Sequence, residues 1–259
     1  LYEFGNAHVA IEGQGMTTVS SGNLGRKQAD SHANRLLGLL ATRDYERLRP
    51  HLHRTPLECG PSLYHAREPI GFVYFVETGV CALMNTMANG VAAKVATIGN
   101  EGMVGLPILL GESEAPHSVF VLVPGVGLRM KARLFKKELA RSASLRAVML
   151  RYANAFINQV AQSAVCDQFH SIQQRYCRWI LMTRDRMQSD EFLLTQRVLA
   201  MMLGVQRTGI SAAASALQRA GFIRYRRGTV TILDRRSLKR HSCECYGVFK
   251  REFDRLLVQ

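Results

Sequence analysis

One stretch of the chain decides the fold: residues 193–234 read LLTQRVLAMMLGVQRTGISAAASALQRAGFIRYRRGTVTILD. Thr195 predicts the start of a helix over Gln196–Leu203, because its hydroxyl can accept a hydrogen bond from the first free backbone amides. Gly204 supplies a tight turn, since glycine tolerates a positive φ. A second helix is predicted over Gln206–Ala220, and two helices joined by so short a turn form a helix-turn-helix. The predicted inward positions are Leu199, Ala200, Val205, Ile210 and Leu217.

The residues that follow predict a β-wing. Residues 222–232, FIRYRRGTVTI, read as two short strands around Arg227–Gly228. A helix-turn-helix with a basic hairpin is typical of DNA-binding modules, so we expect the second helix to enter the major groove with its N-terminal residues first. The predicted contact residues are polar side chains of both helices and the wing: Thr195, Gln196, Gln206, Arg207, Thr208, Ser211, Ser215, Arg224, Arg226 and Arg227.

Each group has its own expected role. The fork of Arg207 suits a guanine edge, and Gln206 suits an adenine edge or a phosphate. Thr195 and Gln196 begin the first helix, where backbone amides meet the sugar-phosphate chain. The wing arginines are expected to add phosphate contacts.

The net charge favours a polyanionic partner. The chain holds 34 Lys and Arg against 20 Asp and Glu, a net charge of +14. Residues 171–259 alone hold 17 against 7, and the first 170 residues contribute a net +4. The excess therefore lies beside the helix-turn-helix, as duplex DNA would require. A solubilising surface is the alternative that charge alone leaves open.

Upstream, short β-prone runs are separated by turn residues, which indicates a sandwich, jelly roll or barrel. The runs are 62–64, 73–76, 80–84, 91–98 and 119–123, and the turn signals are 59–61, 77–79, 88–90, 98–100 and 124–125. Asn89–Gly90 predicts a tight hairpin.

Helices are predicted on both sides of this region. Short ones are expected over Asn34–Leu40, Asp44–Leu48 and Ala132–Ala140, and long ones over Ser144–His170 and Ser171–Met187. The first long helix would be roughly 39 Å in length, enough to pack on the β region and on a second copy. The predicted dimerisation stripe recurs every three or four residues: Met149, Tyr152, Phe156 and Val160. A helix buried within one chain is the alternative.

Taken together, the chain resembles the Crp/Fnr family of transcription regulators over about residues 34–257. The resemblance rests on Tyr74–Phe75, Gly79–Val80, Gly99–Asn100–Glu101–Gly102, Leu194–Thr195, Leu203–Gly204–Val205–Gln206–Arg207, Leu217 to Ile223, and Gly228 to Leu233. It implies an α+β chain with an N-terminal jelly-roll-like β-barrel, a long dimerisation helix and a C-terminal winged helix-turn-helix. The expected bounds are 1–33 for a mobile tail, 34–143 for a cyclic-nucleotide-binding-like sensor domain, 144–170 for the helix and 171–259 for the DNA-binding domain.

The resemblance also implies partners. A homodimer would read two major grooves of double-stranded DNA about one helical turn apart, with RNA polymerase as a further partner. The best-known relatives read bases with a Glu and an Arg that correspond here to Thr208 and Ala212, whereas the arginine at 207 is kept. The operator of those relatives therefore does not carry over.

The effector pocket departs further from the family. Leu106 replaces the glutamate that holds a ribose hydroxyl, and no Lys or Arg lies between Lys94 and Arg129 to hold a cyclic phosphate. Glu112 and Glu114 would repel that phosphate. We therefore expect no control by cyclic AMP; a nucleotide or other effector bound in a non-standard way is the alternative. Its predicted pocket is Gly102, Gly105, Leu106, His117 and Ser118.

The remaining features are expected to be structural. Cys243 and Cys245 form a Cys-x-Cys pair near His241, a poor spacing for zinc, so we expect no metal and no cofactor. An iron–sulfur sensor lacks its N-terminal cysteines, because the first cysteine is Cys59. A haem sensor stays open, since His51, His53, His65 and His117 are available.

The sequence also limits the class of protein. It contains no nucleophile elbow, P-loop or H-E-x-x-H motif, so we expect no enzyme. It shows neither a signal-peptide pattern nor a membrane-spanning one, so we expect a cytoplasmic protein with reduced cysteines and no membrane partner. The chain begins at Leu1, and Met16 is a candidate initiator, which leaves the origin of residues 1–15 open.

Overall fold

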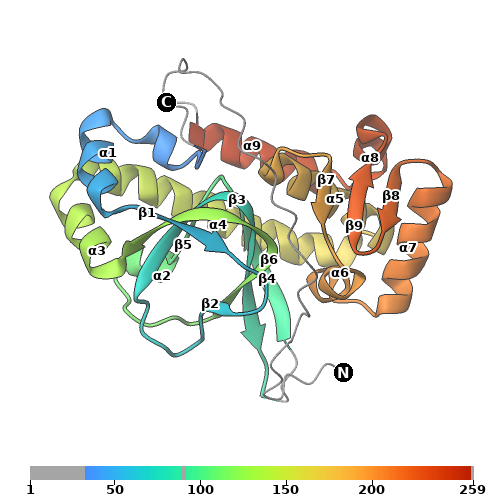
Figure 1. Ribbon diagram of the computed structural model, residues 1–259, viewed down its shortest axis with the longest axis horizontal. Coiled ribbons are helices and arrows are strands. Elements are labelled where there is room, and N and C mark those ends of the chain that lie inside the picture. Colours follow the sequence, from blue (N-terminus) through green and yellow to red (C-terminus); the bar gives the residue numbers. More distant parts are fainter. Residues whose placement is uncertain (1–32, 89–91, 258–259) are drawn as a thin grey trace, which may run out of the picture.

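The computed structural model describes residues 33–88 and 92–257 of the chain (Figure 1). Residues 1–32 of the expected tail lie outside these ranges, and so does the expected hairpin at Asn89–Gly90. Within them the chain is mixed α+β, with an antiparallel sheet, a long helix behind it and a helical C-terminal module beside it.

Six strands form the N-terminal sheet: β1 (His53–Leu57), β2 (Ser62–Tyr64), β3 (Phe72–Thr86), β4 (Ala92–Ile98), β5 (Met103–Val104) and β6 (Ser118–Lys131). Their main order is β1-β6-β3-β4, while β2 also pairs with β6 and β5 with β3, all antiparallel. The pairings among the described strands do not close a barrel, so the expected jelly-roll-like architecture holds in a loose sense. Neither β1 nor β5 was among the predicted runs.

Two expected turns, at 77–79 and 124–125, are bulges inside continuous strands. Both β3 and β6 run through them, and their pairing shifts register around Thr78. Gly79 has a φ of +98°, and a Cβ there would lie 2.8 Å from the Val123 carbonyl oxygen. The two backbones approach too closely for a side chain. The glycines therefore mark a bend in paired strands, a use that sequence alone does not separate from a turn.

Short helices surround the sheet: η1 (Leu37–Leu39), α1 (Thr42–Leu48), η2 (Arg49–His51), α2 (Leu106–Leu109) and α3 (Ala132–Arg141). The helix expected over 34–40 is reduced to the single turn η1. Asn34 explains this, because its side-chain amide donates to the carbonyls of Val76 (2.7 Å) and Gly102 (2.9 Å) while its side-chain oxygen accepts from the Leu37 amide (3.0 Å). Its tertiary contacts override the local helix signal.

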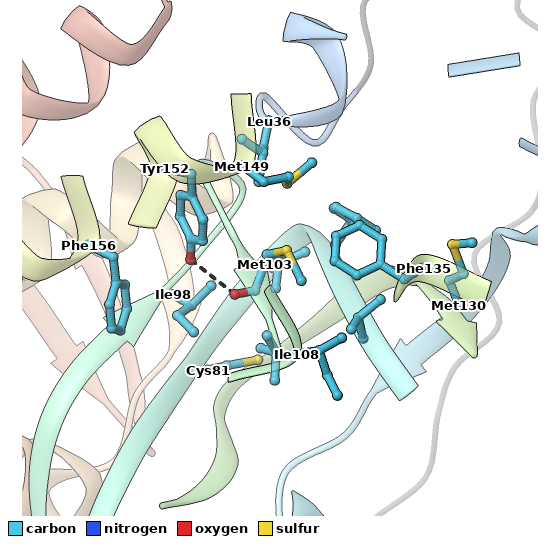
Figure 2. Close-up of a cluster of buried hydrophobic side chains, with 14 of the residues drawn as sticks. Leu36, Cys81, Ile98, Met103, Ile108, Met130, Phe135, Met149, Tyr152 and Phe156 are labelled. Carbon is cyan, nitrogen blue, oxygen red and sulfur yellow. Dashed lines mark hydrogen bonds between the residues drawn. The ribbon is translucent and has the colours of Figure 1, made fainter. Parts of the chain in front are cut away.

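The long helix α4 (Ala143–Phe169) packs its main apolar stripe on its own sheet. Met149, Tyr152 and Phe156 are 0%, 1% and 5% exposed, and Val160 packs against the same core. Figure 2 shows Tyr152 above Met103 and Phe156 beside Ile98, with the Tyr152 hydroxyl donating to the Met103 carbonyl at 3.0 Å. The prediction that this stripe faces a second copy is therefore wrong for Met149, Tyr152 and Phe156, because the folded chain uses them as its core, and it stays a prediction for the half-buried Val160.

The C-terminal module contains α5 (Ile172–Met187), β7 (Glu191–Leu193), α6 (Gln196–Leu203), α7 (Arg207–Arg219), β8 (Ile223–Arg226), β9 (Thr229–Ile232), α8 (Arg235–His241) and α9 (Cys245–Leu257). Its strands pair in the order β7-β9-β8. The expected helix-turn-helix and wing are confirmed, and α6 has the predicted bounds. Figure 1 shows α9 running back along α4. None of the described helices is both long and apolar enough to cross a membrane.

A buried ion pair joins this module to the sheet. Arg186 of α5 binds Glu101 with contacts of 2.5 Å (Nη2–Oε1) and 3.2 Å (Nε–Oε2). It also donates to the Thr97 hydroxyl at 2.8 Å and to the Thr97 carbonyl at 3.3 Å. Gly99 makes room, because a Cβ there would overlap the Arg186 side chain. We call this contact the interdomain clamp.

Apolar packing reinforces the interdomain clamp. Val80 and Met84 of β3 and Leu122 of β6 share one buried cluster with Trp179 and Leu181 of α5. Burial of apolar surface is non-directional, whereas a planar guanidinium matches a carboxylate in one geometry. The cluster therefore holds the module against the sheet, and the interdomain clamp sets its orientation.

Arg186→Met should lower the free energy of unfolding by about 3–5 kcal/mol, because it leaves the Glu101 charge buried and unpaired. Urea denaturation of the full chain measures this. The matched control is Arg184→Met, which removes a half-exposed pair with Asp190 and should cost less than about 1 kcal/mol. Equal losses in the two variants would contradict the clamp.

Candidate nucleic-acid interface

The two central helices are fixed by their ends. The Thr195 hydroxyl accepts from the Val198 amide at 3.2 Å and so caps α6. Gly204 closes α6 in the left-handed region, with a φ of +62°. Leu199 and Ile210 are fully buried where α6 and α7 meet. The sequence signals for this turn therefore correspond to the capping and packing that the structure shows.

The first turn of α7 is presented outward. Gln206 is its N-cap residue, and Gln206, Arg207 and Thr208 are exposed. Within the described part of the chain, the Arg207 guanidinium forms no ion pair. Free backbone amides and the positive end of the helix dipole lie at this same end. The arrangement suits a polyanion that approaches α7 from its N-terminus.

Two predicted contact residues instead bind each other. The Ser211 hydroxyl donates to the Gln196 side-chain oxygen at 2.9 Å, and both residues are half-buried. This hydrogen bond joins the start of α6 to the second turn of α7. Ser215, one turn further along α7, is also half-buried. In the free protein, Gln196 and Ser211 therefore set the angle between the helices.

The wing is a tight hairpin with a basic tip. Arg227 and Gly228 have φ values of +49° and +80°, the pair of positive angles that a two-residue hairpin turn needs. Arg224, Arg226 and Arg227 are exposed. The Leu194 amide donates to the Gly228 carbonyl at 2.6 Å, which holds the tip beside the start of α6. The basic wing and Thr195 therefore lie close together.

A buried arginine that sequence reasoning missed supports the turn. Arg175 of α5 donates to the Leu203 carbonyl at 2.5 Å and pairs with Asp167 at 2.8 Å. The Leu203 carbonyl lies at the end of α6, where helix carbonyls lack intrahelical partners. A positive charge there also suits the helix dipole. The sequence carries no local signal for this contact, because the two residues are 28 positions apart.

The five residues predicted as an effector pocket are mostly engaged by the protein itself. Gly102 lies under Tyr152, so that a Cβ would be 2.5 Å from its hydroxyl, and Leu106 packs on the core. The Ser118 hydroxyl accepts from the Ala66 amide at 3.0 Å. Gly105, at the start of α2, has a φ of +108°. Figure 2 shows Met103, Ile108 and Cys81 filling the adjacent interior.

His117 does not offer a cation there. It is half-buried, and its Nδ1 atom has no hydrogen-bond partner among the described residues. Burial lowers the pKa of this ring, which favours the neutral form at pH 7.

Two surface cavities lie elsewhere. One, of about 380 Å³, is lined by Arg35, Glu101 and Arg186 together with residues of α9. The other, of about 740 Å³, lies between residues 38–42 and the start of α4. Neither is lined by the five residues predicted for an effector, so that pocket stays a prediction.

Comparison with known families identifies two domains. The family described as cyclic nucleotide-binding domain matches residues 54–142, and the family described as Crp-like helix-turn-helix domain matches residues 174–241. A search of curated proteins gave no match.

Solved structures share the fold over most of the chain. FixK2 from Bradyrhizobium japonicum is 14% identical with a TM-score of 0.64, covering 74% of this chain and 98% of that one. TTHB099, a CRP-family transcriptional regulator from Thermus thermophilus, is 17% identical with a TM-score of 0.60, covering 73% and 96%. CLP from Xanthomonas campestris, described as a c-di-GMP responsive global regulator, is 16% identical with a TM-score of 0.53, covering 74% and 99%.

The exposed arginines predict two separable effects on DNA binding. Arg207→Ala should cost about 1–3 kcal/mol per half-site and relax the preference at one base pair. Arg226→Ala should weaken binding almost equally on all sequences. It should also reduce the slope of log K against log salt concentration by about one, because one phosphate contact is lost. Fluorescence anisotropy on a preferred and a scrambled duplex, over a salt series, measures both. An equal loss on both duplexes from Arg207→Ala would argue against base contact.

Proposed function

Because it joins a cyclic nucleotide-binding domain to a Crp-like helix-turn-helix domain, the chain belongs to the Crp/Fnr family of transcription regulators, and we propose that it binds duplex DNA sequence-specifically as a homodimer, without control by cyclic AMP. In this proposal, residues 34–143 form the sensor-like domain, 144–170 the dimerisation helix and 171–259 the DNA-binding domain. One observation carries it: the exposed first turn of α7 stands beside a basic wing on a module fixed to the sheet.

The proposed roles follow from exposure. Arg207, Gln206 and Thr208 read base edges in the major groove. Thr195 and the arginines of the wing hold phosphates and so set the register. We propose that Gln196 and Ser211 act mainly on the angle between α6 and α7, because their side chains are paired with each other. This refines the direct contacts that the sequence predicts for them.

We propose that the homodimer forms through a second stripe of α4. Its members are exposed and alternate three and four residues apart, the spacing of a coiled-coil seam: Ala147, Leu150, Asn154, Ile157, Ala161, Ala164 and Gln168. Leu150 and Ile157 are 49% and 57% exposed in the single chain. We call this stripe the α4 seam.

The composition of the α4 seam favours two helices. Small residues at 147, 161 and 164 allow close approach of the helix axes. In the seven-residue repeat of a coiled coil, labelled a to g, Asn154 occupies an "a" position. One buried asparagine at such a position specifies register and a two-stranded state at some cost in stability. A second copy of this chain supplies the matching Asn154. A two-fold axis between the paired α4 helices would then place one α7 helix at each of two half-sites.

We propose that the β domain does not bind cyclic AMP. A buried phosphate needs a cation or several backbone donors, and residues 95–128 contain no Lys or Arg. Leu106 offers no acceptor for a ribose hydroxyl, and the interior beside it is filled by apolar side chains.

An effector of another kind is the second candidate. The match to a cyclic nucleotide-binding domain favours it, and one relative in structure is described as c-di-GMP responsive. With or without an effector, we propose that the protein acts in the cytoplasm and that it has RNA polymerase as a partner besides DNA.

Ile157→Glu should give a monomer, because two carboxylates would be buried against each other at the α4 seam. Sedimentation velocity measures this, and affinity for a two-half-site duplex should fall to that for a single half-site. Ala140→Glu adds the same charge at an exposed position of α3 and should leave the dimer intact. A wild-type monomer at micromolar concentration, or an Ile157→Glu variant that stays dimeric, would contradict the proposal.

Cyclic AMP and cyclic GMP should leave the melting temperature and DNA affinity unchanged at concentrations that saturate a micromolar site. Each lost charge-assisted contact costs roughly 1.5–3 kcal/mol, and about 1.4 kcal/mol is a tenfold change in affinity. Loss of the ribose and phosphate contacts therefore moves binding toward millimolar. Titration calorimetry checks this, and micromolar binding of either nucleotide would overturn it.

A further inference from the structure

Four side chains that the proposed function does not use converge where α4 ends and α9 begins. Cys166 and His170 lie one turn apart at the end of α4, while Cys243 precedes α9 and Cys245 is its first residue. The sulfur atoms of Cys166 and Cys243 are 3.6 Å apart, and the Cys245 sulfur is 3.7 Å from His170 Nδ1. All four candidate ligand atoms lie within 4.8 Å of one another.

We propose that Cys166, His170, Cys243 and Cys245 bind one Zn²⁺ ion as a closed tetrahedral site. With zinc–sulfur bonds of about 2.3 Å and zinc–nitrogen bonds of about 2.0 Å, the ligand atoms of a tetrahedron are roughly 3.5–3.8 Å apart. The sulfur–sulfur and sulfur–nitrogen separations of 3.6 and 3.7 Å fall within that range. Three sulfurs and an imidazole are a ligand set that zinc prefers, and ligand atoms this close together leave room for a single ion rather than an iron–sulfur cluster.

The surroundings orient two of the ligands. His170 Nε2 lies 3.0 Å from the Glu244 carboxylate. A ring that binds zinc through Nδ1 carries its proton on Nε2 and donates it to this carboxylate. A carboxylate behind a ligating histidine is the usual support of a zinc site. The Gln162 amide donates to the Cys245 sulfur at 3.1 Å, which a thiolate accepts better than a thiol does.

A buried arginine beside the cluster also favours a negatively charged site. Arg178 is 2% exposed, and its Nε and Nη2 atoms have no hydrogen-bond partner among the described residues. Its guanidinium lies over the ring of Phe249 at 5.1 Å, and Phe249 packs in one buried cluster with Cys166 and Cys243. A ring face and the Met182 sulfur, 3.8 Å from Nη1, do not neutralise this charge, and a buried cation without a counter-charge is costly. Three thiolates around Zn²⁺ carry a net charge of −1, which compensates the charge of Arg178.

The spacing explains why sequence reasoning expected no metal. Cys243 and Cys245 form a poor pair alone, and nearby His241 is engaged elsewhere, with Nδ1 2.9 Å from the Ser237 carbonyl oxygen. The missed signal is Cys166-x-x-x-His170, which places two ligands on one face of a helix. The fold brings the two halves together across about 75 residues. Zinc would thus fasten α9 to the junction of α4 and α5.

Metal analysis of the full chain tests the proposal. Protein purified under reducing conditions and loaded with zinc should retain about one Zn²⁺ per chain after gel filtration. The Co²⁺-substituted protein should show the intense visible bands of tetrahedral cobalt and thiolate-to-cobalt charge transfer. Cys166→Ser and Cys243→Ser should lose the stoichiometric zinc, while Cys59→Ser, outside the cluster, should keep it. The wild-type measurements stand even where a cysteine variant fails to fold.

A second variant tests the role of Glu244, which is 74% exposed and therefore removable without loss of the fold. Glu244→Ala should weaken zinc binding about 10–100-fold in a chelator competition at unchanged stoichiometry. Glu112→Ala, at an exposed position on the β domain, should change nothing. Absence of stoichiometric zinc, an octahedral cobalt spectrum, or a Cys166–Cys243 disulfide in the reduced preparation would overturn the site. Unchanged affinity in Glu244→Ala would overturn the assignment of His170.

Discussion

A buried guanidinium is costly unless it is paired and hydrogen-bonded, and for Arg186 that pairing is made across a domain boundary. Arg186 of α5 binds Glu101 and Thr97, both in or beside the turn that follows β4. The Thr97 carbonyl also accepts from Gln159 of α4 at 2.8 Å. The sheet, the long helix and the DNA-binding module therefore meet at one set of polar contacts. Any rotation of the module would leave charges unpaired in the interior, which is why this contact fixes the position of α7.

The helix α4 has more than one role because it has more than one apolar face. Met149, Tyr152 and Phe156 line the face on the sheet. Gln162 and Cys166 face α9 and its N-terminal loop. The α4 seam is exposed, and we propose that it receives a second copy. A 27-residue helix can serve these three neighbours because each contact repeats along its own line of positions three or four residues apart.

Sequence predicted what is local and missed what is distant. Thr195 and Gly204 mark α6 with its observed bounds, and Arg227–Gly228 marks the wing, because caps and tight turns depend on neighbouring residues. Gly79 was misread because a bulge and a turn need the same backbone freedom. The stripe through Phe156 was found by its period, but periodicity does not say which neighbour a face meets. Arg186 and Arg175 depend on partners far along the chain, so no local pattern could reveal them. The cluster of Cys166, His170, Cys243 and Cys245 consists of two local pairs, and only the fold shows that the pairs meet.

We propose that the interdomain clamp and the α4 seam together hold two α7 helices at a fixed separation. Selection of bound duplexes from a random pool by the full chain, followed by sequencing, tests it most directly. Two α7 helices held at a fixed separation should select an inverted repeat whose half-site centres are about 10–10.5 base pairs apart, or a multiple of that spacing. Enrichment of single half-sites, or of pairs at variable spacing and orientation, would contradict it.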